Sequence, residues 1–120
     1  MNDNLILVKS MDFAVRIVNL YKHLCDEHKE YVLSKQVLRS GTSVGANIRE
    51  ALQGQSKPDF ISKMSIALKE TSETEYWLEL LVNTDYLTQS EYDNIQKDCG
   101  EIARLLISIV KSSRKTATKT

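Results

Sequence analysis

The sequence predicts an all-α protein, an up-down-up-down antiparallel four-helix bundle that is oligomeric. Apolar residues recur at spacings of three and four in four long stretches, which is the period of an amphipathic helix. No stretch alternates apolar and polar residues as a half-buried strand would. The 120 residues include one proline and four glycines, which indicates few turns and long elements. Such helices joined by short loops favour an up-and-down bundle.

The first helix is expected to begin at Ser10, a suitable N-cap residue. Residues 4–8 are too short a run for a helix of their own. We expect them to form an extended segment that packs on the bundle or on a neighbouring subunit. The charged residues 26–30 end the helix. Its apolar stripe comprises Phe13, Ile17, Leu20, Tyr21 and Leu24.

The second helix is expected to be capped by Ser34 and to end at Gly54 in the left-handed conformation. Its core stripe comprises Val37, Gly41, Val44, Ile48 and Leu52.

Small residues fill the middle of this second helix. A glycine inside a helix costs about 1 kcal/mol relative to alanine. Gly41 and Gly45 therefore indicate the close approach of another helix. The many dispersion contacts of such an approach would offset the loss of helix propensity. We expect Gly45 and Ala46 to lie at an interface between subunits.

The third helix has the clearest start in the chain. Ser56 and Asp59 have the spacing of a capping box, and Pro58 stands in the first turn, where its missing N–H costs nothing. The helix is expected to reach Asn83. Its core stripe comprises Phe60, Met64, Ala67, Leu68, Thr71, Leu78 and Val82.

A second apolar patch on this helix comprises Ile66, Trp77 and Leu80, which project from nearly the opposite side. It predicts an oligomer interface, because a monomeric bundle exposes a polar face. The alternative is a tryptophan lying flat at the helix edge. Glu73 lies within the patch, and we expect it to form an interfacial ion pair with Arg39 or Arg49.

The last helix is expected to start with a capping box, either Thr88 with Glu91 or Ser90 with Asp93. It is expected to end near Lys111. Residues 1–112 then form a single domain, and the basic residues 113–120 a disordered tail. The broad apolar face comprises Ile95, Cys99, Ile102, Ala103, Leu106, Ile109 and Val110.

The charge is zero overall but unevenly spread. Residues 35–69 carry six basic and two acidic groups, residues 70–101 nine acidic groups and one lysine, and residues 102–120 five basic groups. These blocks either neutralise each other across packed helices or form a basic surface for nucleic acid. The candidate nucleic-acid-binding residues are Lys35, Arg39, Arg49, Lys57, Lys63, Arg114, Lys115 and Lys119.

The sequence offers no constellation for catalysis, and we expect no enzymatic activity, metal or cofactor. His23 and His28 are five residues apart, so they do not share a helix face. The glutamates of residues 70–79 could hold a cation or act as acid and base, but a solvated face or ion pairs with a neighbouring helix explain them better. Ser40, Thr42 and Ser43 have no base beside them.

The chain is expected to be cytoplasmic. No run reaches the roughly 18 apolar residues of a membrane span, and the N-terminus lacks the features of a signal peptide. Cys25 and Cys99 are expected to be reduced core residues.

The runs LRSGTSVGANIREA and DFISKMSIALKETSETEYWLELL resemble the four-helix-bundle proteins encoded in intervening sequences of bacterial large-subunit ribosomal RNA genes. The resemblance spans residues 13–110. It is most specific at residues 45–48 with Glu50, and at residues 67–78 with Trp77. It implies a small cytoplasmic bundle that assembles as a ring-like homopentamer.

The same family includes accessory proteins of diversity-generating retroelements, which resemble basic pentamers that bind nucleic acid and a reverse transcriptase. The neutral charge of this chain departs from them, and the family supplies no catalytic motif to carry over. We therefore expect either an oligomeric module that binds RNA or a ribonucleoprotein, or a purely structural or protein-binding scaffold. An enzyme would need a metal or cofactor that co-purifies.

Overall fold

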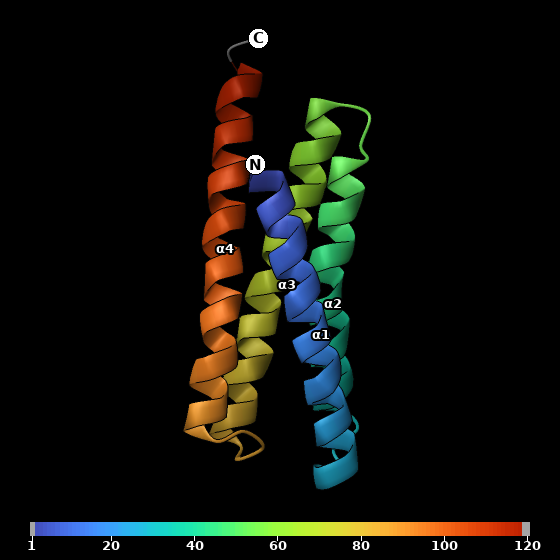
Figure 1. Ribbon diagram of the computed structural model, residues 1–120, viewed down its shortest axis with the longest axis vertical. Coiled ribbons are helices and arrows are strands. Elements are labelled where there is room, and N and C mark those ends of the chain that lie inside the picture. Colours follow the sequence, from blue (N-terminus) through green and yellow to red (C-terminus); the bar gives the residue numbers. More distant parts are fainter. Residues whose placement is uncertain (1, 119–120) are drawn as a thin grey trace.

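The computed structural model describes residues 2–118, with side chains described for residues 5–116, and confirms an all-α fold of four helices. They are α1 (Asn2–His28), α2 (Leu33–Leu52), α3 (Lys57–Asn83) and α4 (Gln89–Thr118). No strand occurs among the described residues. The molecule measures 52 × 22 × 20 Å, and the helices lie roughly along its long axis (Figure 1).

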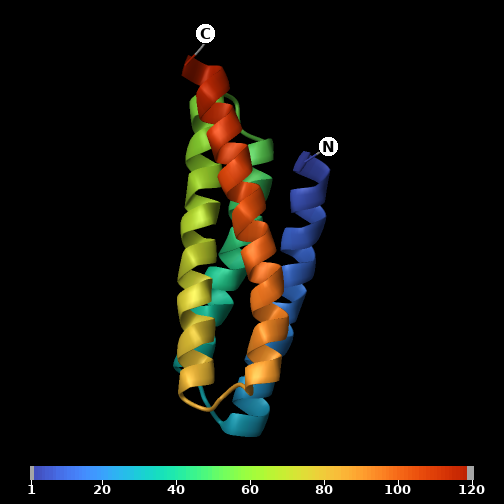
Figure 2. The same ribbon diagram turned by 90° about the vertical axis from the view of Figure 1, so that its left-hand side faces the viewer.

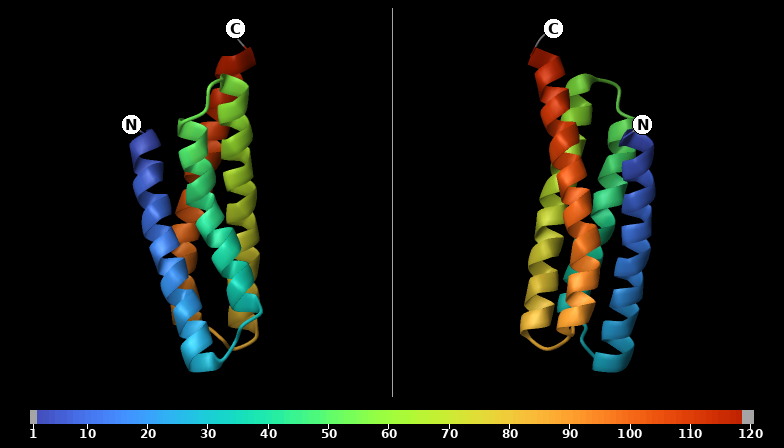
Figure 3. Two further views of the ribbon diagram at one scale, coloured as in Figure 1. Left: turned by 90° about the vertical axis from the view of Figure 1, so that its right-hand side faces the viewer. Right: turned by 60° about the vertical axis from the view of Figure 1, so that its left-hand side comes forward.

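The four helices stand at the corners of a bundle that is two helices thick. Each of α1 and α3 packs against α2 and α4, whereas α1 and α3 stand at diagonal corners, where their backbones do not approach each other closely. Figure 2 shows that α1 leans away from α4 towards its N-terminus, and both views of Figure 3 agree. The α2–α3 loop lies at the same end of the bundle as both chain ends, and the other two loops lie at the opposite end (Figure 1).

The core consists of apolar side chains at spacings of three and four from all four helices. The predicted stripes are largely confirmed. Seven of their residues are only partly buried, namely Leu20, Tyr21, Leu52, Phe60, Leu68, Val82 and Ala103. The fully buried large side chains are Ile6, Phe13, Ile17, Leu24, Val37, Val44, Ile48, Met64, Leu78, Leu81, Ile102 and Leu106.

The start of α1 differs from the prediction. Residues 4–8 belong to the helix and are not an extended segment. Ser10 is therefore no cap; it is buried in the middle of the helix and donates a hydrogen bond to the Leu7 carbonyl. The reason is the core register: Ile6 and Ser10 continue the inward-facing row of Phe13 and Ile17, so the packing extends the helix backwards.

Glu30, and not Ser34, caps α2. Its carboxylate accepts hydrogen bonds from the backbone N–H groups of Val32, Leu33 and Ser34, while the Ser34 hydroxyl donates to the Glu30 carbonyl. Burial raises the pKa of Glu30, but these N–H groups outweigh it and hold the pKa below its usual value. A glutamate can reach back over the first turn and satisfy three N–H groups that one serine could not.

Two glycines of this region act through close approach. A Cβ at Gly41 would lie 2.7 Å from Ile17 Cγ1, so this glycine lets α1 and α2 pack tightly. At Gly54 the predicted left-handed conformation is wrong, because no described glycine has a positive φ. A Cβ at Gly54 would displace the Asp59 carboxylate and approach the Ala51 carbonyl to 3.1 Å, so this site favours glycine through tight packing.

The remaining helix ends follow capping rules. Ser56 caps α3 by accepting a hydrogen bond from the Asp59 N–H at 3.2 Å, as predicted.

Asp85, at φ 68°, ends α3 in the left-handed conformation, and the Tyr86 N–H then donates to the Leu81 carbonyl. At α4 the structure confirms the box of Thr88 with Glu91, whose side chains accept from each other's backbone N–H.

Residues 113–118 continue α4, where we expected a disordered tail. Ser113 falls in the core register, and the Thr116 hydroxyl donates to the Ser112 carbonyl. Arg114 and Lys115 suit the negative end of the helix dipole. Lys119 lies outside the described residues. None of the helices in the described part of the chain is long and apolar enough to cross a membrane.

The Glu30 cap predicts a pH-dependent stability. Its folded-state pKa is lowered, so the cap stabilises the protein above the ordinary glutamate pKa of about 4.3, and this contribution is lost as the pH falls through the lower folded-state pKa. We expect Glu30→Ala to lower the free energy of unfolding by about 1–2 kcal/mol at pH 7. In urea titrations, the difference from the unsubstituted protein should shrink towards pH 2.

Glu27→Ala is the matched control, since Glu27 is an exposed glutamate in the last turn of α1. It should change stability by less than about 0.5 kcal/mol. Equal losses for both variants at pH 7 would contradict the capping role of Glu30.

The two glycines of α2 should respond in opposite directions to alanine. Gly41→Ala forces Ile17 to move, and we expect a loss of about 1–2 kcal/mol. At Gly45 the nearest atoms to an added Cβ are those of Ser10, at 3.5 Å and beyond, so Gly45→Ala should gain up to about 1 kcal/mol of helix propensity. Thermal unfolding of the two variants measures both. A stable Gly41→Ala protein would refute the close approach of Ile17.

Candidate interaction surfaces

The most prominent exposed apolar feature of the described residues is a stripe along the N-terminal half of α1. It comprises Leu5, Val8, Met11 and Val15, which are 42 %, 60 %, 49 % and 52 % exposed. We call these four residues the α1 stripe. Helix α1 is therefore apolar on its outer side as well as on the side that faces the core. A contiguous exposed apolar patch is typical of an interaction site.

A groove of about 310 Å³ runs beside this stripe, between α1 and α2. Met11 belongs to both the stripe and the groove. Gly45 and Ala46 line the groove from α2, so two of the predicted interface residues adjoin the α1 stripe. Gly45 is half-buried and Ala46 exposed. This stripe was not predicted, because an extended segment at residues 4–8 would have no outer helical side.

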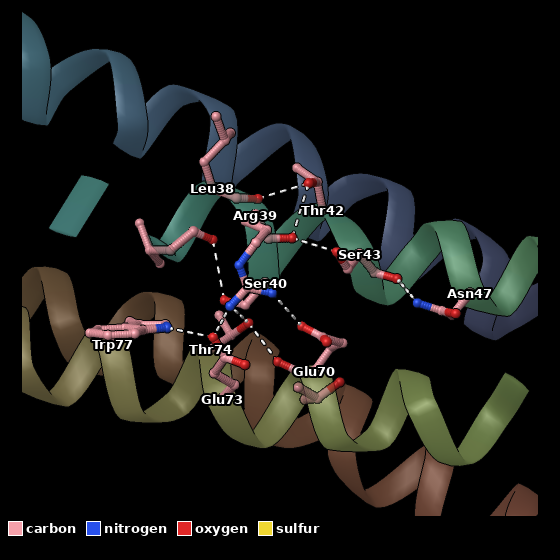
Figure 4. A network of polar contacts seen from close by, with 12 residues as sticks. Leu38, Arg39, Ser40, Thr42, Ser43, Asn47, Glu70, Glu73, Thr74 and Trp77 are labelled. Atoms are coloured by element: carbon pink, nitrogen blue, oxygen red, sulfur yellow. Dashed lines mark hydrogen bonds and ion pairs between the residues drawn. The ribbon is translucent and has the colours of Figure 1, made fainter. Parts of the chain in front are cut away.

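A polar network connects α2 to α3 (Figure 4). Arg39 contacts both Glu70 and Glu73, and Glu73 also accepts a hydrogen bond from the Trp77 indole N–H at 2.9 Å. Deeper in the bundle, the Thr74 hydroxyl donates to Ser40 Oγ at 2.9 Å. Glu73 thus forms the expected ion pair with Arg39, but within one chain and not between subunits.

The predicted patch of Ile66, Trp77 and Leu80 is only partly exposed to solvent. Trp77 and Leu80 are half-buried, and Trp77 packs against the core of its own chain, with Tyr76 edge-on to its ring at 5.1 Å. The alternative of a tryptophan at the helix edge describes it better. Ile66 remains 37 % exposed.

Ile66 lies in a shallow apolar depression of about 570 Å³ on the outer side of α3. We call this the α3 depression. Pro58 and Ile61 also line it, with Lys69 and Arg114 at its edge. Because α1 and α3 occupy diagonal corners, the α1 stripe and the α3 depression are separate surfaces of the bundle.

The hydroxyls of α2 bond back to their own helix. Thr42 donates to the Leu38 carbonyl, and Ser43 donates to that of Arg39. The Asn47 amide donates to the Ser43 carbonyl in the same way. These bonds hold the small polar side chains against their own helix backbone, so the diameter of α2 stays small here.

Opposite charges gather at the two ends of the bundle. The end with the α2–α3 loop, residues 49–63 and 108–116, carries six basic and two acidic side chains. The other end, residues 22–35 and 76–93, carries three basic and seven acidic ones. We call these the basic end and the acidic end. The basic side chains of the basic end are Arg49, Lys57, Lys63, Lys111, Arg114 and Lys115.

The predicted nucleic-acid residues therefore divide into three groups. Arg49, Lys57, Arg114 and Lys115 gather at the basic end together with Lys63, which contacts Glu50 at 3.1 Å. Arg39 is held by two glutamates in the middle of the bundle. Lys35 lies at the acidic end, on the first turn of α2.

The Cys99 thiol and the two histidines take part in packing contacts. Burial raises the pKa of the Cys99 thiol to about 12, and its Sγ faces the Thr71 carbonyl at 3.7 Å. His23, His28 and Tyr86 form an edge-to-face cluster with ring centroids 5.2 and 5.6 Å apart, which ties the end of α1 to the α3–α4 loop. Within residues 5–116 no three His, Cys, Asp or Glu side chains gather in an arrangement that could hold a metal ion.

The fold agrees with the comparisons to known proteins. Residues 2–108 match the family model of the 23S rRNA-intervening sequence protein. The chain belongs to this family. A similar solved structure is a protein of unknown function from the S23 ribosomal protein family of Bacteroides thetaiotaomicron, which is 64 % identical. The alignment covers 92 % of this chain and 99 % of that one, with a TM-score of 0.92. Among curated proteins, none is significantly similar to the chain.

The family match confirms the resemblance noted in the sequence. Two of its most specific parts, residues 45–48 and 67–78, lie on α2 and α3, the two helices joined by the Arg39–Glu73 network. The residues that most closely resemble the family therefore lie on the pair of helices α2 and α3.

Proposed function

We propose that this chain is a non-enzymatic, up-down-up-down four-helix bundle that assembles into a homo-oligomer, a ring of five, and binds RNA or a ribonucleoprotein at its basic end. One observation carries the assembly: the α1 stripe leaves four large apolar side chains exposed beside a groove lined by Gly45 and Ala46. Covering the stripe with another copy would remove its apolar surface from water.

A ring of five copies requires two different surfaces on each copy. One surface of a copy packs head-to-tail on the other surface of the next copy until the ring closes. The chain offers the α1 stripe and the α3 depression, which lie on diagonal helices. We infer that the α1 stripe of one copy packs on the α3 depression, with its exposed Ile66, of the next. The number five comes from the resemblance to the intervening-sequence family.

The charge distribution supports the RNA proposal. The basic end concentrates six basic side chains in a chain of zero net charge, and a local positive field attracts phosphate whatever the total charge. The family's name refers to 23S rRNA, and the similar solved structure belongs to a family named for a ribosomal protein. A cytoplasmic location would suit such a partner.

A protein-binding scaffold without a nucleic-acid role is the second candidate. The observation that favours it is the neutralisation of Arg39 by Glu70 and Glu73 and of Lys63 by Glu50. Two of the expected phosphate ligands are then engaged within the chain. Capture of a nuclease-resistant protein partner, without any RNA binding, would support this alternative.

The assembly is tested by placing charge on the α1 stripe. We expect the double variant Val8→Glu and Val15→Glu to lower the mass measured by light scattering, because two buried carboxylates would oppose the contact. The control is Val32→Glu, which alters a side chain that is 70 % exposed at the acidic end. An unchanged mass for the double variant would contradict the assignment of this interface.

Trp77→Ala is not a clean probe of the assembly. Trp77 packs on its own core and donates to Glu73, so its removal also destabilises the single chain.

RNA binding is tested by its dependence on salt. We expect the affinity for a structured RNA to fall more than about tenfold between 50 and 200 mM salt, since each phosphate contact releases counterions. The double variant Arg49→Gln and Lys111→Gln should bind more weakly and lower the salt slope by about one for each lost contact. Lys22→Gln with Lys29→Gln at the acidic end is the control. Absent or salt-independent binding would remove the RNA proposal.

A further inference from the structure

A polar cleft opens at the basic end, between the α2–α3 loop, the first turn of α3 and the C-terminal turns of α4. Its volume is about 580 Å³, within the range of small-molecule sites. No residue of α1 lines it. The reason is visible in Figures 1 and 2, where the last turns of α4 project past the start of α1. We call this the serine cleft, after Ser56 of the loop and Ser108, Ser112 and Ser113 of α4.

Ser113 is the unusual residue of this cleft. It stands where the core register of α4 calls for an apolar side chain, four residues after Ile109 and seven after Leu106. It is 8 % exposed. The other five buried polar side chains within residues 5–116 all make a hydrogen bond inside the protein, whereas Ser113 makes none.

Solvent still reaches the Ser113 hydroxyl, because the fully enclosed side-chain oxygens without a partner among the described residues are Ser65 Oγ and Gln96 Oε1. Ser113 lines the serine cleft, so a molecule bound in the cleft could accept a hydrogen bond from this hydroxyl in place of water.

The chemistry of the lining favours an anion. Each serine hydroxyl can donate one hydrogen bond, including that of Ser56, whose oxygen already accepts from the Asp59 N–H. Lys57 adds a positive charge, with its Nζ 5.9 Å from the centre of the Phe60 ring. Asp59 does not itself line the cleft, although its carboxylate lies against Gly54, which does. The floor is apolar, formed by Phe60 and Ile109.

We propose that the serine cleft binds the phosphate group of a nucleotide. Ser113, Ser56 and Lys57 contact the phosphate, and the ribose or base lies against Phe60 and Ile109. A charge-assisted bond from a hydroxyl to a phosphate oxygen is stronger than a neutral one, and an aromatic side chain can stack on a base. This inference rests on the proposed RNA function, since it names the place where one nucleotide of an RNA strand would be held.

The test uses calorimetry of the full chain with adenosine 5′-monophosphate, inorganic phosphate and a ten-nucleotide single-stranded RNA. We expect the nucleotide to bind more tightly than inorganic phosphate, because only the nucleotide reaches the apolar floor. Ser113→Val should weaken nucleotide binding at least about tenfold, the worth of one good hydrogen bond to a charged group. Lys57→Gln should do the same.

Ser113→Val replaces the hydroxyl with two methyl groups and restores an apolar residue to a core position, so its thermal unfolding should be no lower than that of the unsubstituted protein. The matched controls are Ser72→Ala, an exposed serine of α3, and Lys22→Gln, an exposed lysine of α1. Both controls should bind the nucleotide normally.

The outcomes separate this inference from the RNA proposal. Nucleotide binding that Ser113→Val does not weaken, or no nucleotide binding at all, would overturn the role of the cleft, even if RNA binds elsewhere. Nucleotide binding that depends on Ser113, without any binding of the RNA, would support the cleft as a site for a free nucleotide and overturn the RNA proposal. Loss of both ligands in Ser113→Val supports both.

Discussion

The structure depends on one geometric constraint: the bundle is two helices thick, so each helix has a single inner side. Four rows of apolar side chains at helical spacing fill that interior, from Ile6 and Phe13 on α1 to Leu106 on α4. Any further apolar surface must then point outwards. Helix α1 carries such surface in Leu5, Val8, Met11 and Val15, which its own chain leaves uncovered. This excess of apolar surface over the available interior supports the proposed self-association.

The polar residues show how a chain of zero net charge acquires a charged end. The opposed charges of α2 and α3 meet where the helices pack, as in the contacts of Arg39 with Glu70 and Glu73. Such pairs remove charge from the middle of the bundle. At the end with the α2–α3 loop, basic side chains outnumber acidic ones by six to two, so a positive charge remains there. Net charge therefore describes this protein poorly, because binding responds to the local field.

Buried hydroxyls have two different roles in this bundle. Ser40 and Thr74 bond to each other across α2 and α3 and fix how these helices meet. Ser113 occupies a comparable core position without a bond, at the end where α4 extends beyond α1. The first arrangement stabilises the fold, whereas the second leaves a donor facing a cleft. Position along the bundle, and not residue type, makes this difference.

The sequence by itself determined the all-α class, the four helices, most of the core, the Ser56 cap and the family, and it narrowed the start of α4 to two capping boxes. These depend on local spacing and on short-range hydrogen bonds, which a single stretch of chain records. Only the tertiary structure decided that α1 begins before Ser10, that Glu30 caps α2, that α4 continues past Lys111, and that Trp77 packs on its own core. It also decided which charges meet and where the α1 stripe and the serine cleft lie. These features depend on which helices stand side by side and on how far each one reaches, and contacts between distant residues leave no periodic trace in the sequence.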